Sequence, residues 1–246
     1  MFACIGPPSN FAKLWIIRIS SARVPAASFH SSLRCVMKSL LKFPPIYLAT
    51  QTAIGAKKAR KTCVDEFAKP SPGMRVLDVG CGPGFVIEYL PGVQYVGTDI
   101  DFKYIQHAKK QYGHLGDYHC LELNAENMRE LGKFDVVLLN GVLHHIDDAG
   151  VLDLLTLIRE CLNPAGRLMT LDGCFYESMS PVSRYLIRND RGQYVREQDA
   201  YLGLAKYIFP SVEHHHRTDL FSIPYDALVM VCSLAADDTL QDQDLD

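Results

Sequence analysis

VLDVGCGPGF, residues 76–85, is an apolar run that breaks into glycines at every second position, namely Gly80, Gly82 and Gly84. Such a pattern is typical of a buried strand that turns sharply into a helix. In an open α/β sheet, ligands bind at the carboxyl ends of the strands, and glycines let the backbone approach the ligand closely. The turn therefore predicts a site for a nucleotide-like cofactor, although a purely structural turn is an alternative.

Around this turn, short apolar strands alternate with helical patterns. We expect strands at 75–79, 94–98, 118–123, 134–139 and 167–171, and helices at 85–90, 102–112 and 151–162. This alternation indicates βαβ units around a parallel sheet. The last third has a loop-rich stretch at 172–195, a helix at 198–209 and strands at 212–217 and 227–233, which favour an antiparallel pair. The predicted fold is α/β, doubly wound and Rossmann-like, with a mostly parallel seven-stranded sheet and an antiparallel C-terminal strand pair.

The composition favours a single core and an uneven distribution of charge. The chain has 246 residues, 48% of them hydrophobic, and it has no 18-residue uncharged apolar run that would predict a membrane span. Residues 1–64 carry ten Lys and Arg and no acidic residue, so the remainder has fifteen basic and twenty-eight acidic residues. An acidic body argues against nucleic-acid binding. The eight scattered cysteines favour a reducing compartment and predict no metal site.

Three segments are predicted along the chain. Residues 1–36 are Ser-rich and free of acidic residues, as in an organelle transit peptide, but a disordered leader or a misassigned start are alternatives. Residues 37–235 form the folded domain, which begins with a basic helix at 47–67, and residues 236–246 form an acidic tail. We expect a cytoplasmic protein, or one in a mitochondrial or other organelle matrix if the leader is a transit peptide.

Two acidic residues narrow the choice of ligand. The spacing Gly80-x-Gly82-x-Gly84 differs from the G-x-G-x-x-G of dinucleotide sites, and no Gly-Lys-Ser/Thr of a phosphate loop follows. Asp78, just before the glycines, would repel a phosphate but attract a cationic amino-acid group. Asp99, at the end of the second predicted strand, is placed to bind a ribose diol. Adenosine joined to a cation describes S-adenosylmethionine.

Five motifs together resemble the class I S-adenosylmethionine-dependent methyltransferases, over roughly residues 60–233: VLDVGCGPG, YVGTDID, LELNAENM, FDVVLLNGVLHHIDD and LNPAGRLMTLDG. From Lys38 on, the chain also resembles small bacterial-type members of this family. The resemblance implies that the cofactor is bound by Asp78, Gly80, Gly82, Gly84, Asp99, Ile100, Asn124, Ala125 and Asn140. Ile100 would lie against adenine, Asn124 and Ala125 at its edge, and Asn140 beside the methionine part, although Asn140 could instead cap its strand.

Candidate catalytic and acceptor residues lie close to these motifs. His144 and His145 follow the fourth predicted strand, where an imidazole could act as a base, or could pack or cap the next helix. Residues 174–196 are rich in arginine and aromatic residues and are the predicted acceptor lid. Arg184 and Arg188 lie in it and would share a helix face if that piece is helical. Guanidinium groups bind carboxylate and phosphate, so we expect an anionic acceptor.

The sequence thus predicts a methyltransferase that moves a methyl group from S-adenosylmethionine to a small-molecule acceptor by in-line displacement. A non-catalytic S-adenosylmethionine-binding partner or scaffold protein is the alternative, and a nicotinamide enzyme is a more distant one. Methylation of a nucleic-acid base is disfavoured, because the Asn/Asp-Pro-Pro-aromatic element of amino-methylating relatives is replaced by Asn-Gly-Val-Leu at 140–143. The sequence does not specify the acceptor, its attacking atom or the oligomeric state.

Overall fold

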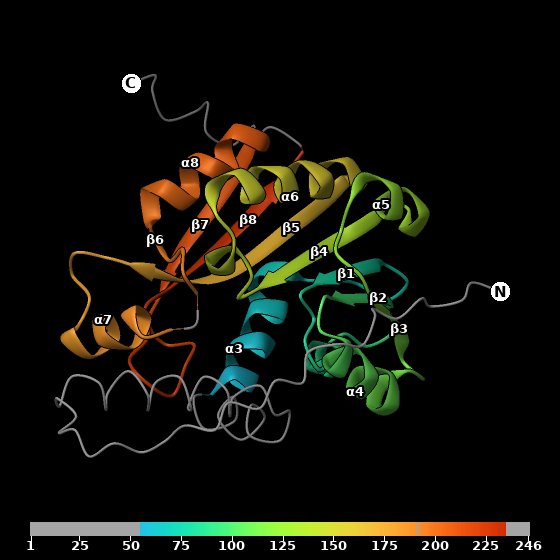
Figure 1. The fold of residues 1–246 in the computed structure, drawn as a ribbon, viewed down its shortest axis with the longest axis horizontal. Coiled ribbons are helices and arrows are strands. Elements are labelled where there is room, and N and C mark those ends of the chain that lie inside the picture. The colour runs from blue at the N-terminus through green and yellow to red at the C-terminus, as the bar shows by residue number, and fades with distance from the viewer. Residues whose placement is uncertain (1–54, 191, 235–246) are drawn as a thin grey trace, which may run out of the picture. The chain divides into compact units, whose positions relative to one another are not determined.

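The computed structural model describes residues 55–190 and 192–234. Figure 1 shows how their helices and strands are arranged. The predicted leader at 1–36, the acidic tail at 236–246 and the first part of the helix predicted at 47–67 lie outside the described residues. The remainder of that helix is present as α3 (Ala56–Cys63), which continues into η1 (Val64–Ala68).

An eight-stranded sheet forms the centre of the fold. Its strands are β1 (Arg75–Val79), β2 (Gln94–Asp99), β3 (Gly116–Cys120), β4 (Phe134–Asn140), β5 (Leu162–Phe175), β6 (Arg196–Glu197), β7 (Ser211–Arg217) and β8 (Ala227–Ser233). The order is β3-β2-β1-β4-β5-β8-β7, and β6 pairs with β5. The first five strands pair in parallel, whereas β8 is antiparallel to both β5 and β7.

This topology confirms the predicted doubly wound α/β fold with its antiparallel C-terminal pair. The predicted number of seven strands is wrong, because the two-residue strand β6 adds an eighth by pairing in parallel with the end of β5. A strand of two residues is too short to produce an alternation of apolar and polar side chains that could be recognised in a sequence.

Helices cover both faces of the sheet (Figure 1). One face carries α5 (Ala125–Leu131), α6 (Asp148–Cys161) and α8 (Gln198–Ile208), and the other carries α3, η2 (Phe85–Tyr89) and α4 (Phe102–Tyr112). Strand β4 shows why both faces of the sheet must be covered by helices. Val137 and Leu139 belong to the apolar cluster that includes α6 and α8, whereas Val136 and Leu138 belong to a second cluster with α3 and α4. Because successive side chains of a strand point to opposite faces, an uninterrupted apolar run requires cover on both.

Two helices, α5 and α7 (Pro181–Arg188), are missing from the prediction. Each is short and begins at a cap. The Asn124 side chain accepts hydrogen bonds from the first turn of α5, and the Ser180 side chain accepts one from the first turn of α7. A capped helix of seven or eight residues has too few turns for an apolar period to emerge.

The topology brings the ends of several strands together at one edge of the sheet. Strands β1, β2, β4 and β5 are neighbours and run in the same direction, so residues that end them share this edge. Ligands of open α/β sheets bind at the carboxyl ends of strands. In the part of the chain described, no helix is long and apolar enough to cross a bilayer.

Candidate functional site

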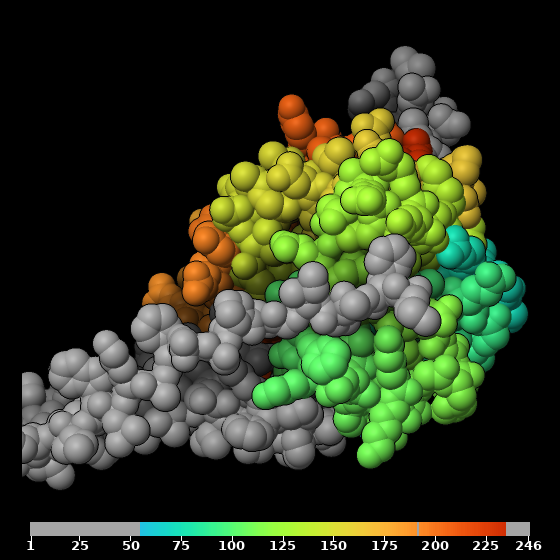
Figure 2. Space-filling view, turned by 45° about the vertical axis from the view of Figure 1, so that its right-hand side comes forward, coloured from blue at the N-terminus to red at the C-terminus, as the bar shows by residue number. Residues whose placement is uncertain are grey.

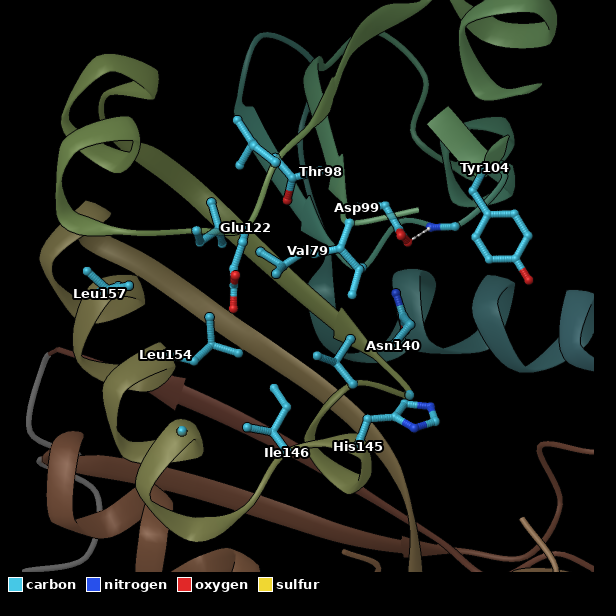
Figure 3. A pocket seen from close by; sticks show the side chains of 18 of the residues that line it. Val79, Thr98, Asp99, Tyr104, Glu122, Asn140, His145, Ile146, Leu154 and Leu157 are labelled. Carbon is cyan, nitrogen blue, oxygen red and sulfur yellow. Dashed lines mark hydrogen bonds between the residues drawn. The ribbon is translucent and has the colours of Figure 1, made fainter. Parts of the chain in front are cut away.

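A cleft of about 830 Å³ opens at the carboxyl ends of β1, β2 and β4 (Figure 3). Five of the residues predicted to bind the cofactor line it: Gly80, Gly82, Asp99, Ile100 and Asn140. Further lining comes from the loop after β3 and from α6. In the space-filling view, α5 and α6 form the upper part of this face of the molecule and α4 forms its lower part (Figure 2). Three strand ends far apart in the sequence thus contribute to one site.

The glycine turn contributes open space to this cleft. Gly80, Gly82 and Gly84 have positive φ angles of 69°, 55° and 84°, a conformation that favours glycine. A Cβ atom on Gly80 would lie 2.7 Å from the Val142 side chain, and one on Gly84 would lie 2.9 Å from the Tyr118 ring. A Cβ atom on Gly82 would meet nothing within 4 Å. Gly82 is therefore the position at which a ligand can approach the backbone, and the other two glycines permit close packing.

Asp99 presents a carboxylate at the end of β2. Its Oδ2 accepts a hydrogen bond from the Gly82 backbone N–H at 2.9 Å, and its Oδ1 accepts one from the Asp101 N–H at 2.8 Å. Burial raises the pKa of Asp99, and these backbone hydrogen bonds oppose that rise. A carboxylate has about four lone-pair sites, so capacity remains for ligand hydroxyl groups. The next residue, Ile100, is 76% exposed at the cleft and offers an apolar surface.

Asp78, which the sequence predicts to bind the cofactor, is not among the residues that line the cleft. It lies in β1 with 2% exposure, and the Tyr95 hydroxyl donates a hydrogen bond to its Oδ2 at 2.7 Å. Burial raises the pKa of Asp78 to about 7, so this group is not the permanently ionised carboxylate that would attract a cation.

Asn140, at the end of β4, does reach the cleft. Its Oδ1 is buried and has no hydrogen-bond partner among residues 55–190 and 192–234. Buried polar atoms in folded proteins are nearly always hydrogen-bonded, so an unpartnered acceptor beside a ligand-sized cleft marks a position for a ligand donor. The Asn140 side chain also forms a hydrogen bond with the Asp78 carboxyl group, so the structural role remains an alternative.

The remaining predicted cofactor residues, Asn124, Ala125 and Gly84, are absent from the described lining. The Asn124 Oδ1 accepts hydrogen bonds from the backbone N–H groups of Glu126 and Asn127 at 2.9 and 3.0 Å, because Asn124 caps α5. The loop contributes to the site through the residues just before the cap, at 121–123.

The two histidines after β4 occupy different environments. His145 lines the cleft. His144 is buried, and its Nδ1 lies 2.7 Å from the Asp172 Oδ1 on β5. The sequence does not distinguish the two, because the selection of one by Asp172 depends on the pairing of β4 with β5.

The residues described as lining the cleft include no arginine of the predicted acceptor lid. Arg184 donates a hydrogen bond to the Tyr176 carbonyl oxygen at 2.8 Å, and Arg188 is exposed on α7. Arg196 is buried, and its guanidinium binds Asp148 and three main-chain carbonyl groups. Arg196 therefore has a structural role, which the sequence-based interpretation of this segment as a lid did not anticipate.

Arg60 is a further charged residue near the site that the sequence analysis did not single out. It belongs to α3, and its guanidinium lies 5.7 Å from the centroid of the Phe85 ring, directly after the glycine turn. Its charge also lowers the pKa of the buried Asp78. In the sequence, Arg60 is one of several basic residues in a row, so only the packing of α3 against η2 identifies it.

Among the described residues, no group of three or more His, Cys, Asp and Glu side chains could hold a metal ion. The consecutive histidines of β7 illustrate this. The His215 ring packs against Phe67, whereas the His216 Nε2 lies 2.6 Å from the Asp226 Oδ1. Their neighbour His214 is exposed. Adjacent residues of a strand face opposite ways, so the three imidazoles do not converge.

Similarity to known proteins agrees with this geometry. A family model described as a methyltransferase domain matches residues 77–168. The malonyl-[acyl-carrier protein] O-methyltransferase of Legionella pneumophila is 33% identical over 114 residues, which are 44% of this chain and 37% of that protein. The ubiquinone biosynthesis O-methyltransferase of Rhizobium johnstonii is 36% identical over 137 residues, 52% of each chain. The chain thus spans about half, or less, of the length of these curated relatives.

A solved structure shares the fold over a larger part of the chain. The magnesium protoporphyrin IX methyltransferase of Synechocystis PCC 6803 with bound SAH superposes with a TM-score of 0.55 and 18% identity, covering 76% of this chain and 87% of that one. At this identity the likeness concerns the fold. Residues 77–168 thus match a methyltransferase domain, and the fold around the cleft at the ends of β1, β2 and β4 is similar to that of solved S-adenosylmethionine-dependent methyltransferases.

Proposed function

We propose that the protein binds S-adenosylmethionine in this cleft and transfers its methyl group to a small-molecule acceptor by in-line displacement. One observation carries the proposal: Gly82, Asp99, Ile100 and Asn140, from three different strand ends, meet at a single cleft. Together they offer a backbone approach, hydroxyl acceptors, an apolar surface and an unpartnered carbonyl oxygen. This combination suits a ligand with a ribose, a flat base and an amino-acid end.

Each group has a distinct role in this proposal. Asp99 accepts hydrogen bonds from the ribose hydroxyls, and Ile100 packs against the adenine ring. The Asn140 Oδ1 accepts from the amino group of the methionine part, and Arg60 attracts its carboxylate. The bound cofactor supplies a methyl group on a positively charged sulfur. The chain contributes by holding the reacting groups in line, which can account for a large share of the rate enhancement.

A small-molecule acceptor is supported by the names of the relatives, which include enzymes of ubiquinone biosynthesis and of magnesium protoporphyrin IX methylation. The anionic acceptor predicted from Arg184 and Arg188 has weaker support, because neither side chain lines the cleft as described. The proposal is therefore limited to a small molecule, without a requirement for negative charge.

Calorimetry with S-adenosylmethionine and S-adenosylhomocysteine tests the binding step. Asp99→Ala removes a charge-assisted hydrogen bond, which contributes roughly 1.5–3 kcal/mol, so we expect affinity to fall about 10- to 100-fold. Asp117→Ala, an exposed carboxylate on β3, makes the same change of charge and should leave affinity unchanged. Equal affinities of the two variants would contradict the proposed site.

Turnover is tested separately with methyl-labelled cofactor and a panel of small-molecule acceptors. We expect labelled product and release of S-adenosylhomocysteine. Tight cofactor binding together with no product over a broad panel of acceptors would instead support a non-catalytic binding protein.

A further inference from the structure

A continuous segment of the chain forms one wall of the cleft. Eight of the nineteen lining residues lie between Gly141 and Leu157, in the loop after β4 and in α6. They include Ile146 and Leu154, whose side chains lie on the side of the cleft away from Asp99 (Figure 3). The shape of the cleft therefore depends on the conformation of this loop and on the position of the first turns of α6.

One buried arginine joins the loop to the start of α6. The loop contains the short 3₁₀ turn η3 (Leu143–His145). The Arg196 Nη1 donates to the carbonyl oxygen of Leu143 at 3.0 Å, and its Nη2 donates to that of Ile146 at 2.8 Å. Its Nε donates to the Oδ1 of Asp148, the first residue of α6, at 2.8 Å. A single guanidinium thus holds both ends of η3 and the helix that follows it.

These contacts use every nitrogen of the guanidinium. Nη1 also donates to the Tyr194 carbonyl oxygen at 2.9 Å, and Nη2 lies 2.7 Å from the Asp148 Oδ1. The Arg196 side chain is 8% exposed, and its Cζ lies 5.5 Å from the centroid of the Tyr201 ring. A guanidinium offers five N–H donors in a rigid plane, whereas an ammonium offers three donors from one point. A lysine at this position therefore could not reproduce the set.

The sheet fixes the backbone of Arg196 relative to the loop. In strand β6, Arg196 pairs with Cys174 and Glu197 pairs with Phe175, both at the end of β5. Strand β5 also pairs with β4, whose end leads into the loop. A shorter side chain at 196 cannot be compensated by a shift of β6 without loss of this pairing.

Other contacts hold the first half of the loop. The backbone N–H of Gly141 donates to the Leu171 carbonyl oxygen at 2.7 Å, and the backbone N–H of His144 donates to the Asp172 Oδ1 at 3.2 Å. Both partners lie on β5. Arg196, in contrast, binds the residues that lead into α6, where the apolar wall of the cleft begins.

We propose that Arg196 is a positioning residue for the cofactor, which holds the wall at 141–157 in the conformation that binds S-adenosylmethionine. This inference rests on the proposed cofactor site. Arg196 is absent from the cleft lining, so it acts through the loop and not by contact. Without the guanidinium, the carbonyl groups of Leu143 and Ile146 lose their donor, and the loop rearranges to satisfy them. The apparent affinity then falls by the fraction of molecules in which the wall is formed.

Calorimetry with S-adenosylmethionine compares Arg196→Ala and Arg196→Lys with Arg75→Ala. Arg75 is the matched control, because it also binds two main-chain carbonyl groups, those of Leu131 and Lys133, but lies at the start of β1, away from the cleft. We expect at least a tenfold loss of affinity in both Arg196 variants, and affinity within about twofold of wild type in Arg75→Ala. Thermal denaturation verifies that each variant is folded at the temperature of the measurement.

Chemical rescue tests whether the missing group itself matters. Arg196→Ala leaves a space beside the carbonyl groups of Leu143 and Ile146, to which a free guanidinium ion can donate. We expect millimolar guanidinium to recover about threefold or more of the lost affinity in this variant. Sodium chloride at the same ionic strength should not. Guanidinium weakens folded proteins in general, so it would not relieve a simple loss of stability.

Hydrogen exchange of the full-length chain, measured by mass spectrometry without cofactor, tests the loop directly. Peptides that cover residues 141–148 should exchange faster in Arg196→Ala than in wild type, because local opening of the loop becomes easier. The same peptides in Arg75→Ala should exchange as in wild type. Equal exchange of this segment in Arg196→Ala and wild type would overturn the proposal.

The outcomes separate this inference from the proposed function. Wild-type protein that does not bind S-adenosylmethionine would refute the proposed function itself. Wild-type binding together with unchanged affinity in folded Arg196→Ala would refute only the role of Arg196. An equal loss of affinity in Arg196→Ala and Arg75→Ala, without rescue by guanidinium, would refute it as well, since general destabilisation then explains the loss. If Arg196→Ala does not fold, Arg196→Lys takes its place in the binding and exchange comparisons.

Discussion

Replacing Asp78 by Asn should change the pH dependence of stability, because this carboxyl group is buried in β1 and has no ion pair recorded among the described residues. Its pKa is raised from 3.8 to about 7, chiefly by desolvation. Between these two values the folded protein keeps a proton that the unfolded chain has released. The free energy of unfolding of the wild-type protein therefore falls as the pH rises through this window, and the loss is complete above about pH 7.

The size of this change in the free energy of unfolding follows from the pKa shift of Asp78. Each pKa unit corresponds to about 1.4 kcal/mol, and roughly two of the three units lie between pH 5 and pH 8. This group should thus lower wild-type stability by about 3 kcal/mol between those pH values. Asn cannot ionise, and its carbonyl oxygen can still accept the hydrogen bond that Tyr95 donates to Asp78. The variant should therefore gain stability relative to wild type as the pH rises.

Urea denaturation at pH 5 and pH 8 measures this difference. The difference between Asp78→Asn and wild type should increase by about 3 kcal/mol from the lower to the higher pH, whereas other titrating groups cancel in the comparison. Asp117→Asn, an exposed change on β3, is the matched control and should show no such increase. Parallel stability profiles for Asp78→Asn and wild type, or a difference of opposite sign, would refute the idea that burial dominates at this position.

Two further predictions concern the loop after β4 and the glycine turn. Arg196→Met leaves Asp148 and three main-chain carbonyl groups without their donor, so urea denaturation should show a loss of about 2–4 kcal/mol, and unchanged stability would contradict a structural role. Gly82→Ala places a methyl group at the cleft and should weaken S-adenosylmethionine binding at least tenfold by calorimetry. Gly73→Ala is the control, because Gly73 also has a positive φ and open surroundings but lies outside the cleft lining. Both substitutions should lower the free energy of unfolding by about 1–2 kcal/mol, whereas Gly73→Ala should leave cofactor binding intact.

The fold is predictable from the sequence wherever apolar periodicity is strong. The strand at Arg75–Val79, the helix at Phe102–Tyr112 and the strand at Ala227–Ser233 have the predicted bounds. Residues 163–166, which separate the predicted helix at 151–162 from the predicted strand at 167–171, are instead part of a longer β5 that starts at Leu162, with a register shift opposite β4. Periodicity reports which side chains are buried, but it does not report where a backbone irregularity is tolerated.

The sequence predicts which residues reach the cleft better than it predicts the contacts that support them. Gly82 and Asp99 line the cleft, and glycine spacing and the end of a strand have a direct meaning for ligand binding. Asp78 and Asn124 are absent from the lining for a common physical reason. Each polar side chain has a partner within the protein, a tyrosine hydroxyl for Asp78 and the helix N–H groups for Asn124. A sequence motif does not reveal that competition.

Gly192 and Arg196 show how part of an apparent substrate lid can act instead as support for the loop after β4. Arg196 binds the carbonyl oxygens of Leu143, the first residue of η3, and of Ile146, the residue that follows η3. Gly192 packs so closely on the His144 ring that a larger residue would displace one or the other. The loop after β4 is therefore fixed by residues about fifty positions later in the chain. Substitution of Gly192 or Arg196 should change the conformation of the loop after β4 before it changes any direct contact with an acceptor, so activity and cofactor affinity need to be measured separately for each substitution.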